Sequence, residues 1–110
     1  MAPFYAMPTT AGSGSEVTAD AVITQEIDGK HVKKPINDLK LVPKGVILDA
    51  QLTATLPASL TISSGMDAIS HVIEILTNRY ASRKTKEVGQ KALPLLMTNL
   101  PPSCRRWEQS

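Results

Sequence analysis

With 110 residues, of which 42% are hydrophobic and 20% charged, the chain has room for one modest globular domain and is too apolar to be disordered. Its formal charge of +2, scattered basic residues and few aromatic side chains argue against nucleic-acid binding. Its single cysteine, Cys104, cannot form an internal disulfide, no Cys/His zinc spacing occurs, and the sequence offers neither a signal peptide nor a membrane-spanning run. We therefore expect a cytoplasmic chain without a nucleic-acid or membrane partner.

The first half of the chain is predicted to consist of short extended elements and turns. Residues 9–15, TTAGSGS, are either a flexible loop or a place where the backbone approaches a ligand. A hairpin is predicted from residues 21–24 and 31–36 around the turn-like Asp28-Gly29. Farther along, Val46–Leu48 is predicted to be a short buried strand.

The second half, from Pro57 onward, is predicted to be helical. One helix is expected from Leu60 to Thr77, and a second from about Lys84 to Leu100. The second helix should be kinked or broken by Pro94 and should end at Pro101-Pro102, and no element is predicted for residues 103–110. The first helix is recognised by apolar residues that recur at steps of four and three and should form its buried stripe: Ile62, Met66, Ile69, Ile73 and Leu76.

The polar face of the first predicted helix carries the residues with the clearest chemistry. At about 100° per residue, Asp67, His71, Glu74 and Asn78 lie opposite the apolar stripe. Asp67 and His71 are four residues apart, so their side chains are neighbours and suit a divalent cation. The alternative is a solvated polar face with an incidental Asp–His pair. Gly65 lowers helix stability by roughly 1 kcal/mol relative to Ala, which is explained if another group must approach the backbone there.

Two strings in this order resemble one family. Residues 8–18, PTTAGSGSEVT, resemble the signature of the iron-containing (group III) alcohol dehydrogenases, and residues 65–74, GMDAISHVIE, resemble that family's metal-binding helix. The resemblance implies an α/β nucleotide-binding domain followed by an all-α domain, in the dehydroquinate synthase-like fold. Residues 1–56 would be the end of the nucleotide-binding domain, and residues 57–110 would be the start of the helical metal domain.

The resemblance also implies a site. Asp67 and His71 match the first two of four protein ligands to a catalytic Fe²⁺ or Zn²⁺, and the other two ligands would lie downstream. His31 matches no ligand position and is expected to be structural or exposed. The residues that match positions near an NAD or NADP cofactor are Thr9, Thr10, Ser13, Thr18, Asp20, Lys33 and Leu52. The alternative for the hydroxyl residues is that they cap their own backbone, and for the lysine that it is merely solvated.

The function implied by this resemblance is hydride transfer between a small alcohol or aldehyde and a nicotinamide cofactor, with metal assistance. Two other interpretations remain open: a catalytically inactive or partner-completed part of such an enzyme, and a glycerol dehydrogenase-like relative. Because the apolar stripe would pack on helices that this sequence does not contain, we also expect exposed apolar surface and self-association, as a homo-oligomer or an aggregate. The sequence specifies neither the alcohol nor the choice between NAD and NADP.

Overall fold

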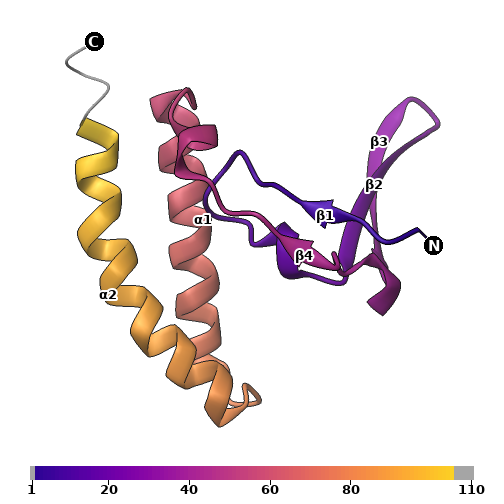
Figure 1. Cartoon of the computed structure of the whole chain (residues 1–110). Helices are drawn as coiled ribbons and strands as arrows, with labels where there is room; N and C mark the ends of the chain where they lie inside the picture. The colour runs from indigo at the N-terminus through magenta and orange to yellow at the C-terminus, as the bar shows by residue number, and fades with distance from the viewer. Residues whose placement is uncertain (1, 106–110) are drawn as a thin grey trace. The chain divides into compact units, whose positions relative to one another are not determined.

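The computed structural model describes residues 2–105, which form two compact units (Figure 1). The first unit comprises residues 2–8 and 14–49 and holds the strands β1 (Tyr5–Ala6), β2 (Asp20–Ile27), β3 (Lys30–Asn37) and β4 (Gly45–Val46). The second comprises Thr9–Ser13 and the chain from Ala50 onward, with the helices α1 (Ala58–Thr77) and α2 (Arg83–Arg105). This order confirms the expected α/β then all-α fold class, while the domain boundary at residue 56 stays a prediction.

The hairpin β2–β3 forms because Asp28 and Gly29 both adopt left-handed backbone angles, with φ of 52° and 72°. Two such residues make the two-residue turn whose twist matches that of paired antiparallel strands. The register runs from Ile27 opposite Lys30 to Asp20 opposite Asn37. The predicted hairpin is therefore confirmed, with strands longer than expected.

The two short strands β1 and β4 pair in parallel, with Tyr5 opposite Gly45 and Ala6 opposite Val46. A Cβ on Gly45 would lie 2.8 Å from Cδ1 of the Tyr5 ring, so the absence of a side chain there lets the edge of this ring approach the neighbouring strand. The short strand expected at Val46–Leu48 is present at Gly45–Val46, but its expected burial and its extension to Leu48 are wrong, because Ile47 and Leu48 follow the two-residue ladder and are 50% and 75% exposed. Parallel strands are normally covered on both faces by helices, and the described residues of this unit include no α-helix.

The second unit is built on α1 and α2, which run side by side in opposite directions (Figure 1). The turn between them is held by Asn78, whose N–H donates to the Glu74 carbonyl and whose Oδ1 accepts from the Tyr80 N–H, both at 2.8 Å. Ser82 then caps α2, because its hydroxyl accepts from the Thr85 N–H at 3.1 Å. The two helices thus form a local antiparallel pair.

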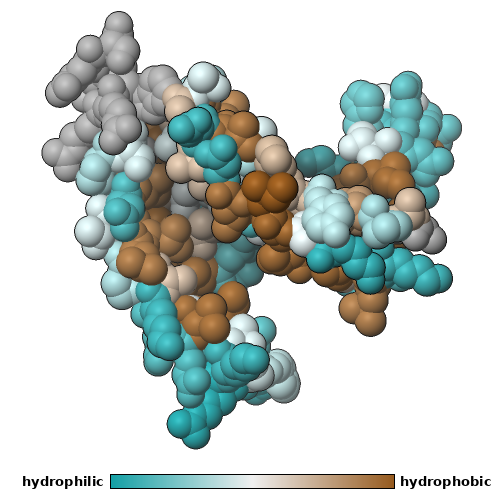
Figure 2. Space-filling view, viewed as in Figure 1, coloured by the Kyte–Doolittle hydropathy of each residue, from teal (hydrophilic) through white to brown (hydrophobic). Residues whose placement is uncertain are grey.

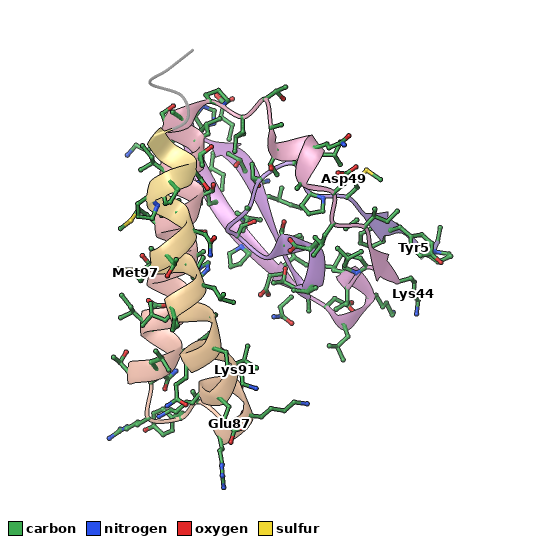
Figure 3. The ribbon with its side chains drawn as sticks, turned by 60° about the vertical axis from the view of Figure 1, so that its left-hand side comes forward. Tyr5, Lys44, Asp49, Glu87, Lys91 and Met97 are labelled. Carbon is green, nitrogen blue, oxygen red and sulfur yellow. The ribbon has the colours of Figure 1, made fainter. Side chains whose placement is uncertain are left out.

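The buried face of α1 lies beside the predicted stripe and not at its centre. Gly65, Ile69 and Val72 are the buried residues of this helix, whereas Ile62, Met66 and Ile73 are about half exposed. Since α2 covers the side of Gly65, the other edge of the stripe faces outward. The expectation of exposed apolar surface is confirmed, and Figure 2 shows hydrophobic side chains on the surface of the helical unit.

The second helix continues beyond its predicted end. The stop expected at Pro101-Pro102 is wrong, because α2 includes both prolines as well as Pro94 and ends at Arg105. Tertiary packing outweighs the loss of the proline N–H donors, since Leu100, the residue just before the pair, lies against Gly65 of α1. Figure 1 shows that α2 changes direction along its length, which agrees with a proline inside the helix. The prediction of no element for residues 103–110 is wrong for 103–105, and residues 106–110 lie outside the described part. No helix of residues 2–105 is long and apolar enough to cross a membrane.

Candidate metal and cofactor site

The two predicted metal ligands, Asp67 and His71, lie on one exposed face of α1. The distance from Asp67 Oδ1 to His71 Nε2 is 3.8 Å, and the two side chains are 48% and 51% exposed. They point away from the α2 side because the buried face of α1 runs through Gly65, Ile69 and Val72. A carboxylate oxygen and an imidazole nitrogen at this spacing can bind the same divalent cation.

The site offers two such donors and no more within residues 2–105, where no group of three or more His, Cys, Asp or Glu side chains could hold a metal. Four protein ligands are typical of a closed zinc site, and three of an open catalytic one. The geometry fits half of a metal site. Further ligands would have to come from outside the described residues.

The segment Thr9–Ser13 belongs to the same unit as α1 and lies against the start of that helix. A Cβ on Gly12 would overlap the backbone carbonyl of Ser64, with the carbonyl carbon 2.6 Å away. Ser64 is three residues before Asp67, so this loop contacts α1 one turn ahead of the predicted metal ligand. The side chains of Thr9, Thr10 and Ser13 are exposed there.

Two of the glycines of this unit, Gly12 and Gly65, are explained by close packing. Gly12 lets the loop backbone touch the α1 backbone, and Gly65 leaves room for Leu100 of α2, whose Cδ2 would lie 2.8 Å from an added Cβ. A group does approach the backbone at Gly65, as the sequence suggested, but it is a leucine of this chain. Gly65 therefore has a packing role in this structure.

Leu52, another predicted cofactor residue, lies in a short 3-10 turn at Ala50–Thr53 and is half-buried. Beside this turn the second unit has a cavity of about 700 Å³ whose lining includes Ala11, Thr53, Leu56, Ser64, Leu96 and Leu100. Its hydroxyl groups are already used within the chain: Thr53 donates to the Ala50 carbonyl at 2.9 Å and Ser64 to the Thr61 carbonyl at 3.3 Å. The cavity is therefore suited to apolar contacts.

The remaining predicted cofactor residues, Thr18, Asp20 and Lys33, belong to the first unit. Thr18 Oγ1 donates to the Ser15 carbonyl at 3.3 Å, which is the backbone-capping role named as the alternative for such residues. The register places Asp20 and Lys33 on the same face of the hairpin, and Lys33 is exposed on the opposite strand. His31 is exposed in β3, as expected.

One residue of this region, Asn37, was missed by the sequence analysis. Its side-chain amide donates to the Asp20 carboxylate across the hairpin, at 2.5 Å. The signal was present, because a two-residue turn at Asp28-Gly29 fixes the pairing of every residue in both strands. Counting outward from that turn pairs Asp20 with Asn37.

The nine predicted site residues are thus divided between the units. Thr18, Asp20 and Lys33 lie in the first unit, and the second unit holds the rest: Thr9, Thr10, Ser13, Leu52, Asp67 and His71. In the second unit, the chain brings the Thr9–Ser13 loop against the helix that carries the metal-ligand pair.

Comparison with known proteins gives this geometry a context. Residues 1–50 match the family model described as iron-containing alcohol dehydrogenase. The chain is 41% identical over 106 residues to an NAD-dependent methanol dehydrogenase of Bacillus methanolicus, covering 96% of this chain and 27% of that protein.

Solved structures of the same family are also similar to this chain. The fold is similar to that of sulfoacetaldehyde reductase from Bifidobacterium kashiwanohense in complex with NAD⁺, with a TM-score of 0.87 and 34% identity over 94% of this chain and 27% of that one. It is also similar to an iron-containing alcohol dehydrogenase from Thermococcus thioreducens, with a TM-score of 0.84 and 33% identity, over 94% of this chain and 26% of that one. The chain thus spans about a quarter of the length of these relatives, and it belongs to the iron-containing alcohol dehydrogenase family.

Proposed function

We propose that this chain supplies part of the active site of an NAD(P)-dependent, metal-dependent dehydrogenase of small alcohols or aldehydes. The observation that carries the proposal is the Asp67–His71 pair, with 3.8 Å between Oδ1 and Nε2 on an open face of α1. The proposal is supported by the similarity of this chain to an NAD-dependent methanol dehydrogenase in sequence, and to a reductase solved with NAD⁺ in sequence and fold. The lone cysteine suits the cytoplasmic location that we also propose.

In this proposal two parts of the second unit have distinct tasks. Asp67 and His71 would bind Fe²⁺ or Zn²⁺, and the loop Thr9–Ser13 would hold the nicotinamide cofactor through its hydroxyl groups and through the backbone at Gly12, where no side chain stands in the way. When bound, the metal would supply Lewis-acid polarisation of the alcohol or carbonyl oxygen, and the nicotinamide would accept or donate the hydride. Thr18, Asp20, Lys33 and Leu52 would contact the rest of the cofactor, NAD or NADP.

A second candidate function follows from the number of donors. Because the described residues hold no group of three metal-binding side chains, the chain by itself could be an inactive part that a further polypeptide completes. Metal affinity separates the two cases, since affinity rises steeply as ligands are added and geometry is fixed.

The test is a calorimetric titration of the chain with Zn²⁺, and with Fe²⁺ under anaerobic conditions. The matched variants are His71→Ala and His31→Ala, because His31 is the other histidine of the sequence and lies exposed in β3. We expect weak binding that His71→Ala abolishes and His31→Ala leaves unchanged. Binding that both variants leave unchanged, or that only His31→Ala removes, would contradict the proposed site.

The strength of binding then distinguishes the two candidates. Tight one-to-one binding that depends on His71 would mean that the Asp67–His71 pair finds further ligands, and alcohol oxidation by the chain should then be measured with NAD⁺ and NADP⁺. Weak His71-dependent binding without turnover would favour the partner-completed chain.

A further inference from the structure

The two outer edges of the hairpin differ in composition. Strand β3, KHVKKPIN, carries three lysines and a proline, whereas β2, DAVITQEI, carries neither residue type. Lysine and proline on an edge strand are the common means by which proteins prevent another strand from pairing there. The edge of β3 is therefore protected, and the edge of β2 is open.

The direction of the backbone groups follows from the register. The Asp38 N–H donates to the Ala19 carbonyl at 3.0 Å, so the pair formed by these two residues is hydrogen-bonded. Pairs alternate between bonded and non-bonded along an antiparallel ladder. Val22, Thr24 and Glu26 therefore stand in non-bonded pairs, and their N–H and C=O groups point away from β3.

The alternation of bonded and non-bonded pairs also explains why a proline is tolerated at position 35. It lies opposite Val22 in a non-bonded pair, so the N–H that proline lacks would have pointed to the outer edge of β3. An incoming strand would find no donor at that position. On the outer edge of β2, by contrast, Val22, Thr24 and Glu26 each present a backbone N–H donor and a C=O acceptor.

One face of the hairpin adds a reason for pairing. Ile23 and Ile27 of β2 share this face with Val32 and Ile36 of β3, and these four side chains are 37–52% exposed. A two-stranded sheet on its own is marginally stable in water. Both sheets of the described residues have only two strands.

We propose that β2 pairs antiparallel with β2 of a second copy of this chain, which forms a four-stranded sheet across a two-fold axis. When the same open edge of two copies pairs, both edges are occupied and no third copy can be added, so the assembly stops at a dimer. Pairing of β2 with β3 of another copy would instead meet Pro35 and the lysines, and it would leave an open edge at each end. The dimer also joins the apolar faces of the two hairpins into one surface.

The first test is the dimer dissociation constant of the chain, measured by sedimentation velocity over a range of concentrations. Thr24→Pro removes an outward donor of β2, and Lys33→Pro removes an outward donor of β3 from the same cross-strand pair. Neither proline removes a hydrogen bond between β2 and β3, so they are matched in their effect on the hairpin. We expect Thr24→Pro to weaken dimerisation at least about tenfold and Lys33→Pro to change it by less than about threefold.

The second test needs no variant and keeps the proposal falsifiable if a proline unfolds the hairpin. Amide hydrogen exchange of Val22, Thr24 and Glu26 in the unaltered chain should slow as concentration rises, whereas the outward amide of Lys33 should not. A monomer at every concentration, equal weakening by both prolines, or exchange at Thr24 that is independent of concentration would overturn the proposal. Self-association that neither proline affects would also overturn it and would point to the exposed residues of α1.

Discussion

Replacement of Gly12 by alanine tests the contact between the Thr9–Ser13 loop and α1. The added Cβ would lie 2.6 Å from the Ser64 carbonyl carbon and 2.9 Å from its Cβ, whereas carbon atoms in ordinary contact are about 3.5–4.0 Å apart. The loop must move by about 1 Å, because the neighbouring atoms belong to the helix backbone and cannot rotate away. The φ of Gly12 lies outside the left-handed region, so an alanine there suffers no backbone strain.

The expected magnitude combines two opposing effects. Overpacking of this kind lowers the free energy of unfolding by about 1–3 kcal/mol. The smaller entropy of the unfolded chain with alanine returns about 0.4–1 kcal/mol. We expect a net loss of about 1–2 kcal/mol, and Gly12→Val should lose more.

The assay is urea unfolding followed by circular dichroism at 222 nm, which reports α1 and α2. The midpoint for Gly12→Ala should fall by about 0.5–1 M, with an unchanged dependence on urea. The control is Gly65→Ala, where the obstructing atoms are the methyl ends of Leu100, which can rotate, and where alanine favours the helix. The reasoning would be refuted if Gly12→Ala matched or exceeded the stability of the unaltered chain, or if Gly65→Ala were the more damaging of the two.

Three further substitutions test the packing of the helices, the turn and the surface. Ile69→Ala should lower the free energy of unfolding by about 2–4 kcal/mol because Ile69 is 9% exposed, whereas Ile73→Ala at 48% exposure should lose less than half as much; equal losses in urea unfolding would contradict the assigned buried face. Gly29→Ala should destabilise the hairpin by about 1 kcal/mol because φ is 72° there, seen as a loss of cross-strand nuclear Overhauser effects; an unaltered hairpin would refute this. Glu87→Gln breaks the 3.0 Å pair with Arg83, which is 94% exposed, and should leave the melting temperature unchanged; a clear drop that disappears at high salt would show that the pair stabilises α2.

The local elements were predictable from sequence where a short pattern decides them. Asp28-Gly29 can adopt a two-residue hairpin turn that other dipeptides disfavour, so the hairpin followed directly. The steps of four and three among apolar residues fixed the existence of α1. The position of its buried face was not fixed, because a band of apolar residues from Ile62 to Leu76 is wide enough for a partner to approach from either side. Only the packing of α2 against Gly65 selects one edge.

The end of α2 and the burial of the strand expected at Val46–Leu48 were predicted wrongly for opposite reasons. Proline lowers helix propensity locally, but the contact of Leu100 with Gly65 is a tertiary effect that a local rule does not include. The apolar run at Val46 suggested burial, yet burial requires a covering layer that the described residues of this unit do not provide. For the candidate site, the spacing of Asp67 and His71 predicted their proximity on α1, whereas the Gly12–Ser64 contact links segments about 50 residues apart and could not be read from any spacing.

The parallel pairing of β1 with β4 has a consequence for the order in which this chain folds. The strands are separated by roughly 40 residues, so their pairing must close a long loop for very few hydrogen bonds. The hairpin lies inside that loop, and its two strands bring residues 20 and 37 together, which shortens the effective separation by nearly half. The helical pair and the hairpin, which close over short turns, should therefore form first. The β1–β4 ladder should join last and open first, so the amides of Lys44 and Ile47, which donate to Phe4 and Ala6, should exchange fastest among the ladder amides.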